Sequence, residues 1–508
     1  MRKINTTKTC AAAASAAILG LLGACDTTTQ TASPMFHEPP EFVDVNGVTA
    51  GRLEAAVTEV EIGERKINTI VFNELYAPPT IRVRPGDEID LNLTNDLVDL
   101  GQPTNIHFHG MQVSPLGDSD NIFRQVQPGT TARYHVAIPA DHERGMYWYH
   151  SHANRFAEWQ VFGGLSGGII VEGILDPFPE LQGITERVML LKNIRSSHDA
   201  SLPNSIITSD PSIHSINGQV NPTITIAPGE TQFWRIGNVG PNQYYRLRLE
   251  GHEFYELARD GNLKSKLVPK SELIIPPSSR LEVLVRGGAP GSYALEMLIT
   301  NTGPLGDTYN NARNRLNSSN PRLATLVSEG PAVEPIVLPT KLREVRDLRK
   351  EPVARKRDIV FTESADGNTF FINGNKFDID VTNTYAKLGD VEEWTIRNAS
   401  DELHVFHIHQ LDFQVTEVNG EPVEFTGHQD TVNTPINGEV KVLIPFTDPV
   451  VLGKFVYHCH IMEHEDAGMM AVIQVSDDKQ SASGAANGSL FGPKDICAYL
   501  QRDEEDPS

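Results

Sequence analysis

Four pairs of histidines, each separated by one residue, are the clearest chemical signal in the sequence. They hold eight of the chain's 17 histidines: His107 and His109, His150 and His152, His407 and His409, and His458 and His460. Residues two apart in an extended strand point to the same side, so each pair can offer two imidazoles to one locus. Eight imidazoles exceed the needs of one ion. They suit a cluster of three metals, two with three ligands and one with two, which leaves open positions for a small substrate.

Cys459 lies between two members of this set, His458 and His460. By the same alternation its sulfur should project to the opposite side of the strand. Neutral nitrogen ligands suit copper, zinc, iron or nickel about equally, whereas an added thiolate favours copper. The sequence therefore predicts a copper protein with a second site behind the cluster.

That second site can be completed by residues close to Cys459 in sequence or in the preceding motif. His464 and Met469 follow Cys459, and His404 precedes the third histidine pair. Two histidines, one cysteine and a weak axial methionine are typical of a blue-copper electron-transfer centre. An electron accepted there needs only the short covalent path through Cys459 to reach the cluster. One such site and a three-metal cluster store four electrons, the number that dioxygen needs to become water.

Composition and charge narrow the class of protein. The chain of 508 residues has 40 glycines and 33 prolines, and long helical apolar periodicity is hard to find. This profile favours an all-β chain with room for three domains. The formal net charge of −23 argues against a nucleic-acid partner, because phosphate binding needs a basic surface.

A repeat supports three copies of one β-sandwich unit. Residues 79–87, 221–230 and 383–390 each predict a strand, a turn centred on glycine and an acidic residue. A second strand then ends near asparagine, in the segments LNLTN, FWRIGN and EWTIRN. The middle copy has no paired histidines and is interpreted as a spacer.

The first and third copies match further, since GMYWYHSH aligns with GKFVYHCH and TNIHFHG with HVFHIHQ. Ser151 then stands where the third copy has Cys459, and Thr104 stands where it has His404. The first copy is therefore expected to keep its paired histidines but to lack a thiolate site.

On the motifs HFHG, HSH, HVFHIH and HCHIMEHEDAGMM, the chain resembles the multicopper oxidase family, in its three-domain laccase-like group. The resemblance implies three consecutive cupredoxin-like, Greek-key β-sandwich domains and four copper ions per chain. It implies that the type 1 copper ligands are His404, Cys459, His464 and Met469. It implies His107 and His407 for the type 2 copper, and for the type 3 pair His109, His150, His152, His409, His458 and His460.

The resemblance also implies acidic residues that assist proton delivery during dioxygen reduction. The segment GDSDN offers Asp120 as the first choice and Asp118 as the alternative, which the spacing does not separate. Glu465, directly after His464, matches the second acidic position. Together with Cys459, these three acids are the candidate catalytic residues.

The sequence leaves two classes of reducing substrate open. A methionine ligand implies a moderate potential, and the substrates could be phenols or aromatic amines. The alternative is a reduced metal ion, Cu(I) or Fe(II), oxidised in periplasmic copper tolerance. The nine methionines form no methionine-rich insert, and Met462 and Met470 are interpreted as core residues, so we favour the laccase-like activity. Two other classes are weaker alternatives, a copper nitrite reductase and a non-catalytic copper-binding envelope protein. The first lacks the paired type 3 copper, and the copper-free envelope relatives of the second have lost the ligands that this chain keeps.

The two ends of the chain carry predictions of a different kind. A positively charged start, an apolar run and the sequence LGAC, which ends at Cys25, resemble a bacterial lipoprotein signal. The mature protein is therefore expected to be exported to the periplasm and anchored to the envelope membrane through lipid on Cys25. No disulfide framework follows from the four cysteines, and the tail around Cys497 is uninformative.

The predicted organisation has seven parts. These are a signal peptide (1–24), a flexible tether (25–43), a first cupredoxin domain (44–178), a middle domain (179–330), a solvated charged linker (331–357), a third cupredoxin domain (358–478) and a flexible tail (479–508).

Overall fold

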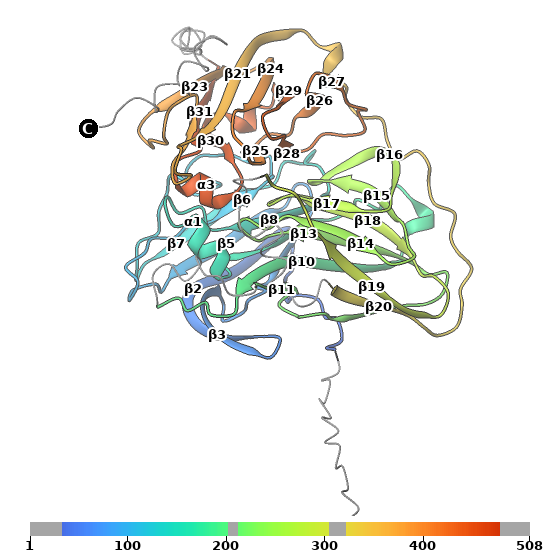
Figure 1. Ribbon diagram of the computed structural model, residues 1–508. Coiled ribbons are helices and arrows are strands. Elements are labelled where there is room, and N and C mark those ends of the chain that lie inside the picture. The colour runs from blue at the N-terminus through green and yellow to red at the C-terminus, as the bar shows by residue number, and fades with distance from the viewer. Residues whose placement is uncertain (1–32, 202–211, 304–321, 478–508) are drawn as a thin grey trace, which may run out of the picture. The chain divides into compact units, whose positions relative to one another are not determined.

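The computed structural model describes residues 33–201, 212–303 and 322–477, and those from Pro34 onward belong to one compact unit. The described residues form six β-sheets, two for each repeat of the sequence (Figure 1). Along the chain the repeats run from blue to green, from green to yellow and from orange to red in Figure 1. This confirms the predicted all-β class of three consecutive domains. In the described residues, no helix has the length and apolar character needed to cross a membrane.

The first domain is a sandwich of a four-stranded sheet, β3-β2-β5-β7, and a five-stranded sheet, β1-β4-β9-β8-β6. Residues of both sheets share one apolar core that includes Leu91 and Phe108. Its elements are β1 (Glu41–Phe42), β2 (Val48–Ile62), β3 (Arg65–Phe72), β4 (Thr80–Val83), β5 (Glu88–Asn95), β6 (His107–His109), β7 (Thr131–Ala137), β8 (Gly145–His150), α1 (Ala157–Gly163), β9 (Ser166–Val171) and the 3-10 turn η1 (Pro179–Leu181).

The middle domain repeats this architecture with sheets β11-β10-β13-β18-β15-β16 and β12-β20-β19-β14-β17. Trp234 and Tyr245 meet in its core from opposite sheets. Its strands are β10 (Thr185–Arg195), β11 (Ser212–Ile216), β12 (Thr223–Ile226), β13 (Thr231–Asn238), β14 (Tyr245–Leu249), β15 (Phe254–Arg259), β16 (Asn262–Lys270), β17 (Leu273–Ile275), β18 (Arg280–Arg286), β19 (Gly291–Leu298) and β20 (Arg322–Ser328).

The third domain pairs sheets β22-β21-β24-β29-β26-β27 and β23-β31-β30-β25-β28 around Trp394 and Phe406. Its strands are β21 (Val353–Glu363), β22 (Phe370–Ile372), β23 (Thr382–Lys387), β24 (Asp390–Asn398), β25 (His404–Ile408), β26 (Gln414–Val418), β27 (Glu421–Pro422), β28 (Thr431–Thr434), β29 (Glu439–Phe446), β30 (Gly453–Cys459) and β31 (Met470–Ser476). Its helical segments are η2 (Leu348–Lys350), η3 (Pro449–Val451) and α3 (Met462–Asp466).

The glycines of the repeat occupy the turns that the sequence predicted. Gly86, Gly229 and Gly389 have φ of 93°, 82° and 96°, a left-handed region that costs glycine least. Each turn joins two strands of the same repeat, β4 to β5, β12 to β13 and β23 to β24.

The asparagine at the end of each second strand has a structural role that explains its recurrence. The side-chain amides of Asn95, Asn238 and Asn398 each donate to two backbone carbonyls, at distances of 2.6 to 3.4 Å. Each side-chain oxygen also accepts from the backbone N–H two residues on. These buried bonds fix the loops that lead into β6 and β25, which carry histidines.

Two predicted segments, the tether and the charged linker, differ in part from the structure. The predicted tether (25–43) is ordered from Pro34 onward: Phe36 N donates to the carbonyl of Thr223, and β1 pairs with β4 in parallel. The backbone N–H groups of this segment find partners on two domains, which a free tether would not do. Residues 1–32, which include the predicted signal and Cys25, lie outside the described residues, as does the tail with Cys497.

The charged segment 331–357 is largely exposed, as expected of a solvated linker, but it is anchored to the fold at a few points. Leu342 and Leu348 are buried, and Arg343 forms a 2.7 Å ion pair with Glu143 of the first domain. Strand β21 begins at Val353, inside the predicted linker. The two leucines between the charged residues anchor the segment, which its charge pattern alone does not predict. The remaining domain boundaries stay predictions.

Candidate metal centres

The eight paired histidines lie at the ends of two matching strand pairs. In the first domain β6 runs antiparallel to β8, with His107 opposite His150. In the third domain β25 runs antiparallel to β30, with His407 opposite His458. The second member of each pair lies two residues on, and all eight side chains are buried.

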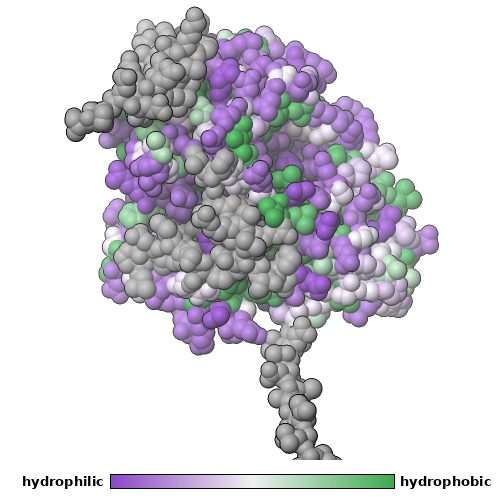
Figure 2. Space-filling view, viewed as in Figure 1, coloured by the Kyte–Doolittle hydropathy of each residue, from purple (hydrophilic) through white to green (hydrophobic). Residues whose placement is uncertain are grey.

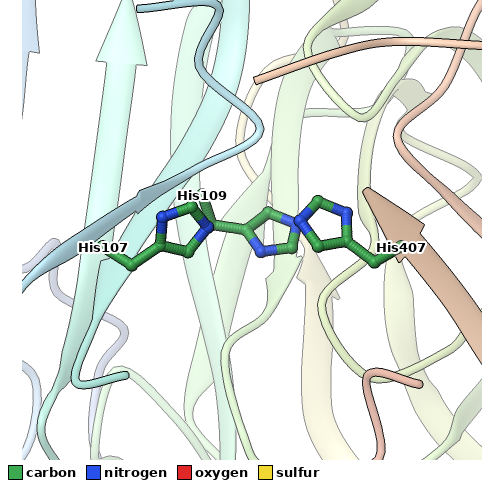
Figure 3. A group of neighbouring side chains, drawn as sticks. All are labelled: His107, His109 and His407. Atoms are coloured by element: carbon green, nitrogen blue, oxygen red, sulfur yellow. The ribbon is translucent and has the colours of Figure 1, made fainter. Parts of the chain in front are cut away.

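These histidines converge from the two domains into one cluster. Three sets have their ring nitrogens within 4.8 Å of one another: His109, His150 and His460; His152, His409 and His458; and His107, His109 and His407. Figure 3 shows His109 between His107 and His407, so that rings from both domains face each other. The shortest contacts, His109 Nδ1 to His460 Nε2 and His409 Nε2 to His458 Nε2, are 3.1 Å each. The first two sets hold three histidines each, and His107 and His407 remain as a pair. This matches the distribution expected for three ions.

The free nitrogens of the cluster fit a metal. His107, His150 and His407 each use Nδ1 for a bond to the protein, to Asp120, Ser151 O and Asp430 O respectively. Their Nε2 atoms are buried and have no hydrogen-bond partner. A metal-binding histidine typically has one nitrogen oriented by the protein and the other presenting its lone pair. Leaving such nitrogens buried and unpaired would otherwise destabilise the fold.

Burial and the neighbouring histidines favour the neutral form of His107, His109 and His150. Burial, followed by the charges of neighbouring histidines, lowers the pKa of His107 and His109 well below the usual range. The same causes lower the pKa of His150 to about 3. Neutral imidazole is the form that binds a metal ion.

Cys459 lies on the other side of β30 from the cluster. Its Sγ is 3.6 Å from Nδ1 of both His404 and His464, and these two nitrogens are 3.1 Å apart. The neighbouring residues His458 and His460 face the cluster instead. Burial raises the pKa of the Cys459 thiol, so a bound cation is needed to stabilise its thiolate.

Two residues that the sequence did not single out support the thiolate site. Ser400 Oγ is 2.8 Å from His404 Nε2, and Glu402 Oε1 is 3.1 Å from His464 Nε2. Both contacts leave the Nδ1 atoms directed toward Cys459. No sequence pattern marks these loop residues, although their closeness to His404 was a usable hint.

The predicted methionine lies in the same buried core as Cys459. Met469 is fully buried, and its carbonyl accepts a 3.1 Å hydrogen bond from Cys459 N. Met462 and Met470 pack in separate apolar clusters, which confirms that they are core residues.

In the first domain, the position equivalent to the thiolate site is filled by a hydrogen-bond network. Thr104 Oγ1 is 3.3 Å from Ser151 Oγ, and both hydroxyls donate to Gln160 Oε1 at 2.8 and 2.6 Å. The alignment of Ser151 with Cys459 and of Thr104 with His404 therefore holds in space, and this locus has no thiolate.

The structure separates the two aspartates that the sequence left open. Asp120 is 2% exposed, its Oδ1 lies 2.9 Å from His107 Nδ1, and it also accepts from Phe108 N and Gln410 Nε2. Burial raises its pKa to about 8, against the opposing effect of these donors, so it can hold a proton near neutral pH.

Asp118 lies outside the cluster, so the geometry favours Asp120 of the two candidates. Its side chain is 51% exposed, with Arg133 as an ion partner at 3.8 Å. The loop turns between the two aspartates, so that only Asp120 points inward.

Glu465 lies between the two sites. It is 2% exposed, with its carboxylate 3.1 Å from His458 Nδ1 and 3.5 Å from His152 Nε2. Burial alone would raise its pKa, but His152 and His458 outweigh burial and lower the pKa to about 2. Glu465 is therefore an ionised acceptor beside the cluster, whereas Asp120 can carry a proton.

Comparison with known proteins agrees with this architecture. Multicopper oxidase domain families match residues 54–175, 190–320 and 351–479. A multicopper oxidase from Staphylococcus haemolyticus is 26% identical over 85% of this chain and 90% of its own. The cell division protein FtsP of Photorhabdus laumondii is also 26% identical, over 80% of this chain and 85% of its own.

Among solved structures, a multicopper oxidase from Campylobacter jejuni, described as a metallo-oxidase, is similar with a TM-score of 0.75. It is 28% identical and covers 87% of this chain and 95% of its own. McoA from Aquifex aeolicus shares the fold, with a TM-score of 0.73 at 22% identity over 88% of this chain and 100% of its own. The family matches and relatives thus identify an oxidoreductase of cupredoxin architecture, whose side-chain clusters could hold metal ions. The chain belongs to the multicopper oxidase family.

Proposed function

We propose that the chain binds four copper ions and couples the one-electron oxidation of four small donors to the reduction of dioxygen to water. His404, Cys459 and His464, with Met469 as the weak axial ligand, would hold the type 1 copper. His107 and His407 would hold the type 2 copper. The remaining six paired histidines, two sets of three, would hold the type 3 pair.

The proposal depends mainly on residues 458–460, where neighbouring side chains at the end of β30 point to opposite sides of the strand. Cys459 faces His404 and His464, while His458 and His460 belong to two different sets of the cluster. A covalent path of one residue therefore joins the thiolate group to both. When bound, copper supplies one-electron redox chemistry at the thiolate and dioxygen reduction at the cluster.

The protein's own groups then have three tasks. Hydrogen bonds from the protein orient the imidazoles, and burial keeps bulk water away from them. Asp120 holds a proton next to His107, where reduction of dioxygen consumes protons. Glu465 places a carboxylate oxygen 3.1 Å from His458 Nδ1, whose hydrogen bond goes to the carbonyl of Cys459.

Asp120→Asn is expected to slow dioxygen consumption by about 10- to 100-fold, because the amide can still contact His107 but cannot carry a proton. Copper content should be unchanged. Asp118→Asn is the matched control, and its rate should stay within about twofold of the wild type, as expected for a surface change. Equal effects of the two substitutions on oxygen-electrode rates would rule out the proton role of Asp120.

For the reducing substrate we favour phenols and aromatic amines, which a protein surface can oxidise without a dedicated metal-binding insert. A second candidate, Cu(I) or Fe(II), is favoured by one observation. Glu402, 3% exposed, places a carboxylate 3.1 Å from the outer nitrogen of His464, where a cation would gain by binding.

Glu402→Gln separates these two substrate classes. If the donor is a metal ion, kcat/KM for Cu(I) or Fe(II) should fall by about 10-fold or more, the scale of one lost charge contact, while phenol oxidation is retained. If phenols are the substrates, wild-type turnover with a phenol should exceed that with either metal ion. Comparable losses for all donors would show that Glu402 only supports His464.

We further propose that the protein is exported and carries lipid on Cys25, on the strength of the leader sequence alone. Mass spectrometry of the mature N-terminus should find a lipid-modified Cys25 as the first residue. A mature chain that begins at another residue, or an unmodified thiol, would exclude the anchor.

A further inference from the structure

A buried arginine of the middle domain reaches the edge of the histidine cluster. Arg280 is the first residue of β18 and is fully buried. Its guanidinium forms a two-pronged ion pair with Asp430 of the third domain, with Nη2 to Oδ2 at 2.6 Å and Nη1 to Oδ1 at 3.0 Å. Paired donors of this kind fix the plane of a carboxylate as well as its position.

Asp430 in turn contacts a histidine from each of the two metal-binding domains. Its Oδ1 is 3.4 Å from His109 Nε2, and its backbone carbonyl is 2.8 Å from His407 Nδ1. These are two of the three rings in Figure 3, and His109 belongs to two of the sets described above. The position of Asp430 therefore bears on the orientation of both rings.

The ion pair packs directly against the first domain. Gly110, which follows His109, has φ of 82°, and a Cβ at this position would collide with the Asp430 carboxylate and lie 2.5 Å from Arg280 Nη2. The glycine of the HFHG motif is thus required by the ion pair, which occupies the space of any side chain. Residues from all three domains meet at this point.

Arg280 has little freedom to move. Its backbone N–H donates to Asp260 Oδ1 at 2.9 Å, its Nε donates to Met146 O at 3.2 Å, and its Nη1 donates to Ser278 O at 3.1 Å. A buried guanidinium with its donors engaged in this way holds Asp430 at a fixed place, whereas a flexible ammonium would not.

We propose that Arg280 is a positioning residue for the histidine cluster, acting through Asp430 on His109 and His407. The middle domain, interpreted from sequence as a spacer, would then help to build the metal site. The inference rests on the proposed copper function, because the rings matter in this way only if they hold ions. Partners that orient metal-binding histidines affect affinity or activity by about 10- to 100-fold.

The chain offers a matched control in the same sheet. Arg235 of β13 forms a buried ion pair with Glu282, which lies two residues from Arg280 on β18. The other partners of Arg235 are Glu186 and the ring of Phe233. Arg235→Lys therefore weakens a comparable buried pair that lacks the link to His109 and His407.

The test compares copper-loaded wild type, Arg280→Lys and Arg235→Lys. Lysine keeps a positive charge beside Asp430, so that folding is preserved, but it cannot form the two-pronged pair. Arg280→Lys should release copper from the histidine cluster to a competing chelator about 10- to 100-fold faster than wild type and alter the EPR hyperfine splitting of the non-blue copper. The blue absorption band of the Cys459 site should be unchanged, and Arg235→Lys should match wild type in both measurements.

Two results would overturn the inference. One is an Arg280→Lys protein with the wild-type EPR spectrum and release rate. The other is an equal change in Arg235→Lys, which would mean that loosening any buried pair of this sheet has the same effect. If Arg280→Lys does not fold, the Asp430→Asn variant, which keeps the backbone bond to His407, takes its place with the same readouts. A wild-type protein that binds no copper in the cluster would refute the proposed function instead.

Discussion

Replacing Cys459 by serine is expected to abolish the blue absorption band and to lower donor oxidation by at least about 10³-fold, the scale seen when one member of a catalytic unit is removed. Serine keeps the size of the side chain but removes the sulfur that lies 3.6 Å from His404 and His464. The cluster residues on the other side of the strand are untouched. Elemental analysis should therefore find about three copper ions where the wild type has four.

The chain contains a control for this substitution. Cys497 is the other cysteine of the body, and Cys497→Ser should keep the wild-type band and rate. Normal turnover in the Cys459→Ser protein would contradict the proposed path from the thiolate site to the cluster.

His109→Gln is expected to have the opposite effect, with loss of copper from the histidine cluster and an intact Cys459 site. His109 contributes to two of the histidine sets and stacks against His407 with ring centroids 4.0 Å apart. Dioxygen consumption should fall by at least about 10³-fold and copper content should drop, whereas the blue band at Cys459 should remain. Visible spectra, copper analysis and oxygen uptake on one sample measure all three quantities.

His198→Gln is the matched control for His109→Gln. His198 is also buried, but it lies against the rings of Trp159 and Phe162 in the first domain, outside the metal-ligating sets. Its substitution should leave copper content and turnover near the wild-type level. If the blue band vanished with His109→Gln, the two sites would not be independent in assembly.

The features that were predictable from sequence depend on local periodicity. Alternation along a strand determines that Cys459 and His458 face opposite ways, whatever the rest of the fold does. The repeat of glycine turns and strand-ending asparagines likewise marks the three sandwiches, since each copy makes the same bonds in place. The equivalence of Ser151 and Cys459 followed from that repeat and holds in the structure.

The features that were missed depend on contacts between distant segments. Arg280 and Asp430 are 150 residues apart, and neither lies in a motif, so only the packing of three domains brings them together. Asp118 and Asp120 differ by the turn of a loop, which spacing does not specify. In the largely exposed segment 331–357, the burial of Leu342 and Leu348 was missed, because the many charges around them dominate the sequence pattern.

The central claim is that Cys459 and its neighbours His458 and His460 bind copper on opposite sides of β30. The most direct test is anomalous diffraction at the copper edge from a crystal of the copper-loaded protein. We expect one isolated peak beside the Cys459 sulfur, His404 and His464, and a separate group of three peaks among the eight paired histidines. A sulfur that ligates the same ion as His458 or His460, or an absence of copper among the paired histidines, would contradict the proposed function.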